Sequence, residues 1–322
     1  MNPLELFYEK ELPSIDRYLE AQAHRLDPSV SPTVRHVLEA GGKRFRPMLT
    51  ILMARALGYR GDDILPLACS LELLHSATLL HDDIVDGARL RRGRQSAHLL
   101  FGATHTILVG DALLALANRL VAEYGIPALT RHLSEALLRT ATGEIREIAH
   151  LRDTNLNIET YYEIITGKTA FLIQAACRCG AVLAGASADL EEAASGFGLA
   201  LGIAFQLVDD ALDYTSPSIV SGKPAASDLK EGKVTLPLIL YLADLDFEER
   251  RRVTDDFAND RLSPEDLENL RRIIVSSGYA DKTREAAASY LAKAKKALEP
   301  FPASPETDLL AHVLVPMLDR KK

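Results

Sequence analysis

The sequence predicts an all-α protein, and three observations support this prediction. Almost every segment of the 322-residue chain repeats its apolar residues with the period of a helix, and no stretch combines strand alternation with hairpin turn chemistry. Apolar residues make up 47% of the chain, which is enough to bury a large core. No linker rich in Pro, Gly or Ser interrupts it, so we expect a single domain over residues 1–322.

Helix start and stop signals place the elements in order. Prolines or capping side chains mark helix starts at Ser31-Pro32, Asp62-Asp63, Asn157 and Ser263-Pro264 with Asp266. The periodicity predicts long helices over residues 62–86, 104–124, 127–150, 158–184 and 188–214, with smaller helices after residue 233. The stretch Thr215 to Gly232 is predicted to be an irregular loop, of a length often found in active-site lids.

Charge and cysteine content restrict the classes of function. A formal charge of −8 argues against general attraction to nucleic acid, so an anionic ligand requires a local basic cluster. Cys69, Cys177 and Cys179 lie in apolar helical stretches, which suits reduced core residues and a cytoplasmic location. The N-terminal stretch has no signal-peptide pattern, and polar residues interrupt the longest apolar run, so we expect no transmembrane segment.

Two copies of one acidic pattern end apolar helical stretches that lie far apart in the chain. They are Asp82-Asp83-Ile84-Val85-Asp86 and Asp209-Asp210-Ala211-Leu212-Asp213. Residues four apart share a helix face, so each copy projects two carboxylates the same way. Two such charges repel by roughly 4 kcal/mol at an effective dielectric of about 20, so a buried pair implies a compensating cation. Oxygen ligands favour Mg²⁺ or a similar hard ion.

Polar residues continue the same helix faces. His75 and Thr78 lie two turns and one turn before the first motif, and Gln206 lies one turn before the second. Apolar neighbours crowd both stripes, so we interpret them as lining a site and not as solvated faces. The acidic pairs Asp62-Asp63 and Asp255-Asp256 differ, because one begins a helix and the other follows a charged run; we interpret both as structural.

Basic residues cluster near these motifs. The segment Arg89–Arg94 contains four arginines within six residues, and Gly41–Pro47 combines glycines with Lys and Arg. Lys168, Lys223 and Lys233 add further cations. The planar arginine fork matches phosphate oxygens. Facing carboxylates, hard cations and a ring of basic residues describe a site for a magnesium-bound polyphosphate, and the lack of a Walker-type loop argues against a nucleotide.

Five ordered segments resemble the motifs of the trans-isoprenyl diphosphate synthases, the polyprenyl synthetases. They are Gly41–Pro47, Leu80–Asp86 with Arg91-Arg92-Gly93, Gly167-Lys168-Thr169, Phe205–Asp213, and Gly222-Lys223-Pro224 with Asp228 to Lys233. The resemblance spans residues 40 to 240 and is strongest to long-chain, octaprenyl-type synthases. It implies a helical bundle of the isoprenoid synthase type with a central active-site cavity, and a homodimer.

The resemblance also implies a reaction and a role for each matching residue. Magnesium-assisted ionisation of an allylic diphosphate would be followed by attack of isopentenyl diphosphate and proton loss, giving a longer all-trans chain. The implied isopentenyl diphosphate ligands are Lys43, Arg46, His75 and Arg92. The implied allylic diphosphate ligands are Arg91, Lys168, Lys223 and Lys233. Thr169 and Gln206 would face the developing cation and the departing diphosphate. The implied magnesium ligands are Asp82, Asp86 and Asp209, supported by Asp83 and Asp213.

Small residues before the first motif predict a long product. In the family, side chains four or five residues upstream of the first aspartate limit chain length, and this sequence has Thr78 and Ala77 there. Each buried methylene contributes about 0.8 kcal/mol, so an open apolar tunnel would hold a long chain and a membrane contact would help its release. We expect a synthase for quinone side chains. One departure is Ala226, where the family often has glycine.

Other functions remain open at this point. A synthase making farnesyl or geranylgeranyl diphosphate, or the catalytic subunit of a two-component synthase, would carry the same motifs. Terpene cyclases share the fold but need no isopentenyl site. A ferritin-like di-iron protein would use the Glu-x-x-His patterns Glu72 to His75 and Glu147 to His150, but it would leave both aspartate motifs without a role.

Overall fold

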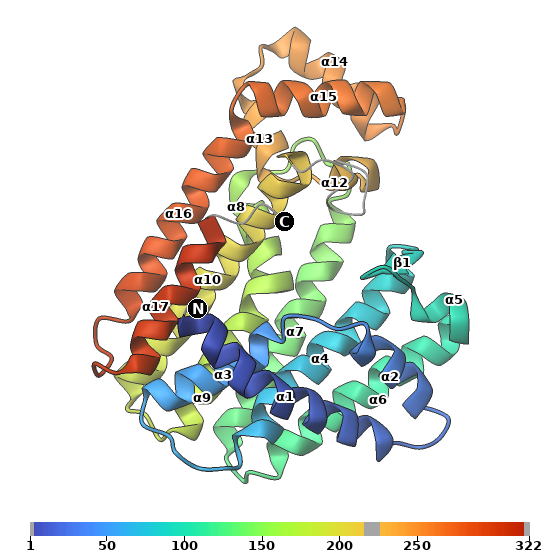
Figure 1. Cartoon of the computed structure of the whole chain (residues 1–322). Coiled ribbons are helices and arrows are strands. Elements are labelled where there is room, and N and C mark those ends of the chain that lie inside the picture. Colours follow the sequence, from blue (N-terminus) through green and yellow to red (C-terminus); the bar gives the residue numbers. More distant parts are fainter. Residues whose placement is uncertain (1–2, 216–225, 319–322) are drawn as a thin grey trace. The chain divides into compact units, whose positions relative to one another are not determined.

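The computed structural model describes residues 3–215 and 226–318 and is almost entirely helical, which confirms the all-α prediction (Figure 1). The described chain forms two compact units. Unit 1 contains residues 3–137, 172–195 and 298–312, and unit 2 contains residues 138–171, 196–297 without the undescribed segment, and 313–318. The expectation of a single domain stays a prediction. Lys223 and its neighbours Gly222 and Pro224 lie outside the described residues.

Unit 1 is built around one buried helix. Its elements are α1 (Pro3–His24), α2 (Ser31–Glu39), α3 (Phe45–Ala56), α4 (Ile64–Val85), β1 (Leu90–Arg91), β2 (Arg94–Gln95), α5 (Ala97–Phe101), α6 (Ala103–Ala122), the start of α7 (Pro127–Ala149), most of α9 (Phe171–Leu183), and parts of α10 and α17. Helices α1, α2, α3, α5 and α6 all contact α4, and Figure 1 shows α1, α2 and α6 beside it. This packing explains why α4 is apolar on nearly every side.

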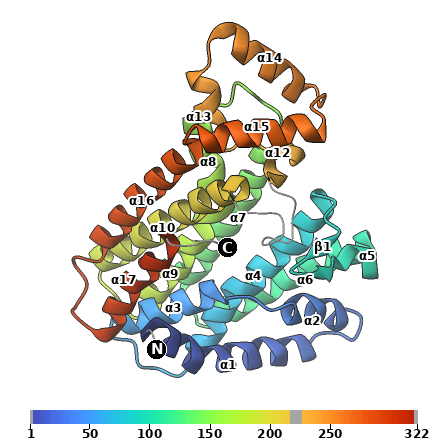
Figure 2. The ribbon, with the colours of Figure 1, turned by 45° about the horizontal axis from the view of Figure 1, so that its top comes forward.

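Unit 2 contains the remaining elements. They are the rest of α7, α8 (Ile158–Ile165), the π-turn η1 (Thr166–Ala170), most of α10 (Ala188–Thr215), α12 (Ser227–Glu231), α13 (Leu236–Asp244), α14 (Phe247–Ala258), α15 (Pro264–Ser276), α16 (Tyr279–Ala297) and the end of α17 (Pro305–Leu318). Helices α13, α15 and α16 pack against one another, and α13 also contacts α8. Figure 2 shows α14 leading into α15 and α15 into α16.

The long helices begin and end within three residues of the predicted positions. Asn157 caps α8 by accepting from the Thr160 amide at 2.7 Å, as its position predicted. Ser263 and Asp266 form a reciprocal capping box at the start of α15. Asp63 precedes α4 without a side-chain capping bond, so its predicted capping role is wrong.

Two local features were not predicted. Strands β1 and β2 form a hairpin with Leu90 opposite Gln95, and its two-residue loop, Arg92-Gly93, has positive φ at both positions, as a type I′ turn requires. Strands of two residues are too short for an alternation of apolar and polar residues to be recognised in the sequence, so the hairpin was not predicted. The predicted helix 158–184 is interrupted by the π-turn η1, which adds a residue to one turn without changing the apolar composition.

Part of the predicted irregular loop is also helical. Ser227–Glu231 forms α12, and Ala226 precedes it with φ 56°, a left-handed conformation that costs an L residue roughly 1–2 kcal/mol. Glycine is the residue that this backbone favours. The departure from glycine at this position therefore introduces local strain.

Among the described residues, three helices are long and apolar enough to cross a membrane by length and composition alone: α4, α6 and α10. Unbroken apolar runs in the sequence did not reveal these helices, because each contains polar residues within a stretch of high mean hydropathy. In α4 and α10, 67% and 72% of the most apolar stretch is buried inside the protein, which accounts for their composition by core packing. The corresponding share for α6 is 44%. The absence of a transmembrane segment stays a prediction.

Candidate active site

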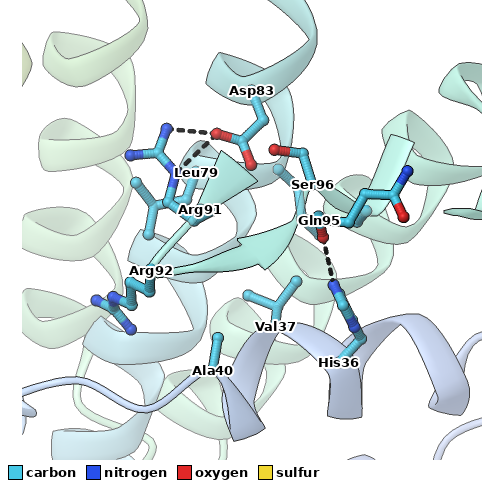
Figure 3. A pocket seen from close by; sticks show the side chains of 11 residues that line it. His36, Val37, Ala40, Leu79, Asp83, Arg91, Arg92, Gln95 and Ser96 are labelled. Carbon is cyan, nitrogen blue, oxygen red and sulfur yellow. Dashed lines mark hydrogen bonds and ion pairs between the residues drawn. The ribbon is translucent and has the colours of Figure 1, made fainter. Parts of the chain in front are cut away.

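The first aspartate motif ends α4 in unit 1, and its members have different surroundings. Asp82 is partly exposed and Asp86 is exposed, one turn apart. Asp83 is only 4% exposed and accepts from the Arg91 guanidinium through Nε at 2.7 Å and through a terminal nitrogen (Figure 3). Asp82 and Asp86 thus suit metal binding better than Asp83, whose carboxylate fixes Arg91. The supporting metal role of Asp83 stays a prediction.

The hairpin that follows α4 turns Arg91 and Arg92 in different directions. Figure 3 shows a small pocket between α2, α4 and the hairpin, with Arg91 pointing toward Asp83 and Arg92 pointing away from it. The Arg92 guanidinium lies against Gly42, where an added Cβ would be 2.7 Å from its terminal nitrogen. His36 of α2 binds the Gln95 carbonyl oxygen at 2.8 Å and fastens the second strand. The hairpin can therefore present two guanidinium groups to two separate anions.

A cationic cluster lies next to Arg92 in unit 1. Burial and the charge of Arg92 lower the pKa of Arg46 to about 10, although Glu72 opposes the shift. The buried Nε of Arg46 has no hydrogen-bond partner among the described residues. Burial and four arginines, Arg46 first, hold the pKa of His75 well below its usual value. Glu72 is itself paired with Arg44 at 3.2 Å. Positive charge is in excess here, which favours an anionic ligand.

The depressed pKa of His75 predicts a pH-dependent stability. Below an unfolded pKa of about 6.5, the unfolded chain gains a proton that folded His75 does not, so the free energy of unfolding should fall by up to about 1.4 kcal/mol per pH unit as pH drops from 6.5. Urea unfolding at pH 7, 6 and 5 measures this free energy of unfolding. It should decrease less with falling pH in the His75→Gln variant than in the wild type, and it should also decrease less in the wild type when inorganic diphosphate is bound. Equal slopes for the variant and the wild type would contradict this.

Other predicted residues of unit 1 lie along the same helix or loop. Lys43 is exposed in the loop before α3. Arg44, in the same motif, is buried and pairs with Asp16 at 2.9 Å, so its role is structural. Ala77 has no exposed surface, and the Thr78 hydroxyl donates back to the His75 carbonyl oxygen at 2.9 Å.

In unit 2, the π-turn η1 is held by close backbone approaches. A Cβ added at Gly143 of α7 would be 2.3 Å from the backbone nitrogen of Lys168. A Cβ added at Gly202 of α10 would be 2.6 Å from the Cα of Ala170. Only glycine fits at both points, so these two glycines allow α7 and α10 to contact the π-turn that carries Lys168 and Thr169.

Lys168 is held by two acidic residues of α7. Its ammonium group lies 2.8 Å from Glu144 and also forms a short bond to Glu147. Burial opposes its charge, but Glu147 and Glu144 raise the pKa of Lys168 above its usual value. Lys233 pairs with Glu231 at 2.7 Å, and Glu147 raises its pKa as well, against burial. Both lysines remain cationic. The sequence pattern indicated no role for Glu144, and for Glu147 only a role in the di-iron alternative.

The second aspartate motif, on α10, divides in a similar way. Asp209 is exposed, whereas Asp210 is 3% exposed and accepts from Tyr161 and Gln206. Asp213 accepts from the backbone amides of Ser227 and Asp228 at 3.2 and 3.1 Å and so caps α12. Its predicted role as a metal ligand stays a prediction, but the structure shows this capping role.

The carboxylates of unit 2 lie close enough to raise one another's pKa. Burial raises the pKa of Asp210 to about 7, opposed by its bonds to Tyr161 and Gln206 and assisted by Asp209. Burial together with Asp213 and Asp210 raises the pKa of Asp228 well above its usual value. A cation would relieve this repulsion. In the described parts of the chain, no group of three or more His, Cys, Asp or Glu side chains is placed to hold a metal ion by itself.

Comparisons with known proteins identify the family. The sequence model of the Polyprenyl synthetase family matches residues 27–274. The chain belongs to the polyprenyl synthetase family. This polyprenyl synthetase is therefore a prenyltransferase that condenses isoprenyl diphosphates, as the motifs predicted.

Similar proteins include enzymes with different product lengths. The octaprenyl diphosphate synthase of Escherichia coli (strain K12) is 35% identical over 87% of each chain. The geranylgeranyl diphosphate synthase of Methanosarcina mazei is 33% identical over 97% of each chain. A polyprenyl synthase from Caulobacter crescentus CB15, solved with calcium and isoprenyl diphosphate, is 38% identical, with a TM-score of 0.93 over 100% of this chain and 98% of that one.

The ferritin-like alternative is wrong for this polyprenyl synthetase. Its proposed iron ligands form other contacts: Glu72 pairs with Arg44, Glu147 pairs with Lys168, and His150 binds Asp153 at 2.7 Å. The di-iron pattern would require these carboxylates to be available to metal. Short Glu-x-x-His patterns in the sequence did not distinguish ion pairs from metal ligands.

Proposed function

We propose that this polyprenyl synthetase is a long-chain, all-trans polyprenyl diphosphate synthase that supplies quinone side chains. The observation that best supports diphosphate binding is the excess of positive charge around half-buried Arg46 and His75 and exposed Arg92, together with the unpartnered Nε of Arg46. A diphosphate would supply the acceptors and negative charge that Arg46 lacks, through charge-assisted bonds. Lys43, exposed in the adjacent loop, would close this isopentenyl diphosphate site.

The allylic diphosphate would bind to the other set of cations. In unit 1, Arg91 is held in place by Asp83, and in unit 2, Lys168 and Lys233 are held by acidic residues. We propose that Lys168 shifts from Glu144 and Glu147 toward phosphate oxygens when the substrate binds. Holding these lysines in advance reduces the entropy lost on binding.

We propose Mg²⁺ as the metal, bound by Asp82 and Asp86 in unit 1 and by Asp209 in unit 2. The bound metal would act as a Lewis acid that stabilises the departing diphosphate. Exposure supports this choice, because Asp86 and Asp209 are exposed and Asp82 is partly exposed, whereas Asp83 is only 4% exposed.

Removal of divalent metal should abolish the reaction. In EDTA the rate should fall at least about 10²-fold, because leaving-group stabilisation depends on the metal. Added Mg²⁺ should restore the rate. The rate with Ca²⁺ should be at least about tenfold lower than with Mg²⁺, because the larger ion tolerates irregular geometry and polarises oxygen less strongly. Product formation from labelled isopentenyl diphosphate measures this. Full activity in EDTA, or equal activity with Ca²⁺, would contradict the proposal.

The long product is proposed from the small residues before the first motif. Ala77 has no exposed surface, so a bulky side chain there must displace neighbours or fill internal space. Ala77→Tyr should shorten the main product by at least one five-carbon unit, and Ala77→Val should shorten it less. Chromatography of the products measures their lengths. An unchanged distribution from a folded Ala77→Tyr variant would show that this position does not limit the chain.

One experiment tests the proposed function as a whole. The purified chain is incubated with Mg²⁺, labelled isopentenyl diphosphate and separate allylic primers of increasing length. Products of eight or more isoprene units would support the octaprenyl-type proposal. Products that stop at farnesyl or geranylgeranyl diphosphate would favour the shorter-chain alternative, and activity only after addition of a second protein would favour a two-component synthase.

We also propose a homodimer in the cytoplasm. Leu99, Leu100, Ile107 and Leu108 of α5 and α6 are exposed apolar residues that a second copy would cover. Cys69, Cys177 and Cys179 are buried free thiols, as suits a reducing compartment. Light scattering gives the mass in solution; a monomer would argue against the dimer. Fractionation of cells tests the location, including a transient membrane contact for product release.

A further inference from the structure

Three hydrogen bonds join four side chains of unit 2 into one chain, which we call the Asp210 chain. The Thr169 hydroxyl donates to Gln206 Oε1 at 2.7 Å, Gln206 Nε2 donates to Asp210 Oδ1 at 2.8 Å, and the Tyr161 hydroxyl donates to Asp210 Oδ2 at 2.5 Å. Tyr161 and Asp210 are 2% and 3% exposed. The chain thus begins in the buried interior of unit 2 and ends at the partly exposed Thr169 of η1.

The Asp210 carboxylate, between Tyr161 and Gln206, fixes the direction of every bond in the chain. Asp210 accepts at both of its oxygens, so Gln206 turns its amide nitrogen toward Asp210 and its carbonyl oxygen toward Thr169. The Thr169 hydroxyl must then donate to that carbonyl oxygen. The distance of 2.5 Å from Tyr161 is typical of a hydroxyl that donates to a charged oxygen. Both oxygens of Asp210 are thereby occupied by donors.

This polarity determines what Thr169 offers to a substrate. Its proton is committed to Gln206, so the free side of its oxygen carries lone pairs. A lone pair directed at developing positive charge stabilises it, whereas a hydroxyl hydrogen directed at the same place repels it. We propose that Asp210, held by Tyr161, is a positioning residue that sets the polarity of this chain, so that Thr169 presents an oxygen lone pair to the allylic cation. This inference rests on the proposed prenyl-transfer reaction.

Asp209 and Asp210 therefore differ in role although they are neighbours in one motif. Asp209 is exposed, as a ligand for a metal–diphosphate complex must be. Asp210 faces the interior, where Tyr161 of α8 and Gln206 of α10 enclose it. Neither the acidic motif nor the apolar pattern of α8 indicates this pairing, because it depends on the approach of two helices.

The decisive variant is Asp210→Asn, which keeps the shape of the side chain but adds a donor. With Tyr161 still donating to the remaining oxygen, the new amide nitrogen must face Gln206. The Gln206 amide must then turn over, and the Thr169 proton must point outward. Single-turnover kinetics should show a rate of chemistry lowered about 10²-fold, with KM for both substrates within threefold of the wild type and a similar thermal midpoint.

A double-mutant cycle with Thr169→Val separates polarity from a merely structural effect. If Asp210 acts through Thr169, then adding Asp210→Asn to the Thr169→Val variant should lower the rate of chemistry less than threefold, because the hydroxyl is already absent. The inference is wrong if Asp210→Asn lowers the rate of chemistry by the same factor with and without the Thr169 hydroxyl. It is also wrong if the single variant Asp210→Asn has a rate within threefold of the wild type. A wild type that forms no prenyl product would instead overturn the proposed function.

Tyr161→Phe provides a second route if Asp210→Asn does not fold. Loss of one donor should lower the rate about tenfold, and this loss should also vanish in the Thr169→Val background. The matched control is Tyr162→Phe, because Tyr162 is the next residue of α8 and its ring packs against Tyr161 outside the chain. Equal losses for the two tyrosine variants, or a Tyr161→Phe loss that persists without the Thr169 hydroxyl, would overturn the inference.

Discussion

Asp209→Asn is expected to lower kcat about 10³-fold without unfolding the protein. Asp209 is the exposed aspartate of the second motif, so an amide in its place leaves no newly buried polar group unsatisfied. The loss of one negative charge should weaken metal binding, and with it the stabilisation of the departing diphosphate. Initial rates at saturating Mg²⁺ and substrates measure kcat, and circular dichroism confirms the fold.

The chain offers a matched control for this substitution. Asp255 is also the first of two adjacent aspartates on a helix, but it lies at the surface of α14 and pairs with Arg251 at 3.8 Å. Asp255→Asn should leave kcat within twofold of the wild type. If Asp209→Asn stays within fivefold of the wild type, Asp209 is not a principal metal ligand and the proposed metal site of unit 2 is wrong.

Gly143→Ala is expected to destabilise the protein by about 3 kcal/mol and to lower activity at the same time. The added Cβ would lie 2.3 Å from the Lys168 backbone nitrogen, and backbone atoms cannot move aside as a flexible side chain can. Either α7 or the π-turn must shift, and a shift of the π-turn displaces Lys168 and Thr169. Urea unfolding measures the loss of stability, and kinetics measure the loss of activity.

Gly196→Ala is the matched control for packing at a helical glycine. An added Cβ at Gly196 of α10 would have its nearest neighbour, the Cβ of Ala297, at 4.0 Å. Alanine stabilises a helix by up to about 1 kcal/mol relative to glycine, so this variant should be as stable as the wild type or more stable. If Gly143→Ala behaves like Gly196→Ala, the close approach of α7 to the π-turn does not constrain the site.

The sequence predicted those parts of the fold that depend on local chemistry. Periodicity placed the long helices, and capping residues such as Asn157 placed their starts, because both signals act within a few residues. The π-turn was missed because its glycine and lysine fit a helix equally well. Its cause is the contact of Gly143 and Gly202 with η1, and these residues are distant in sequence.

The same limit applies to the site. Charge and spacing indicated that both aspartate motifs are functional, but they did not show that the three acids of each motif differ. Asp83 binds Arg91, Asp213 caps α12, and Asp210 binds Tyr161, and each of these partners comes from another element. Spacing along one helix shows which side chains share a face. It does not show which tertiary partner meets each one.

The half-buried guanidinium of Arg46 has a consequence for selection of stable variants. A positive group kept in a poorly solvated place beside Arg92 lowers the stability of the empty enzyme, so neutral replacements there would be selected by any screen for heat resistance alone. On the proposed assignment of Arg46 to isopentenyl diphosphate, such a screen would yield more stable enzymes that no longer bind this substrate. Engineers seeking robust variants should therefore keep this residue fixed and diversify elsewhere.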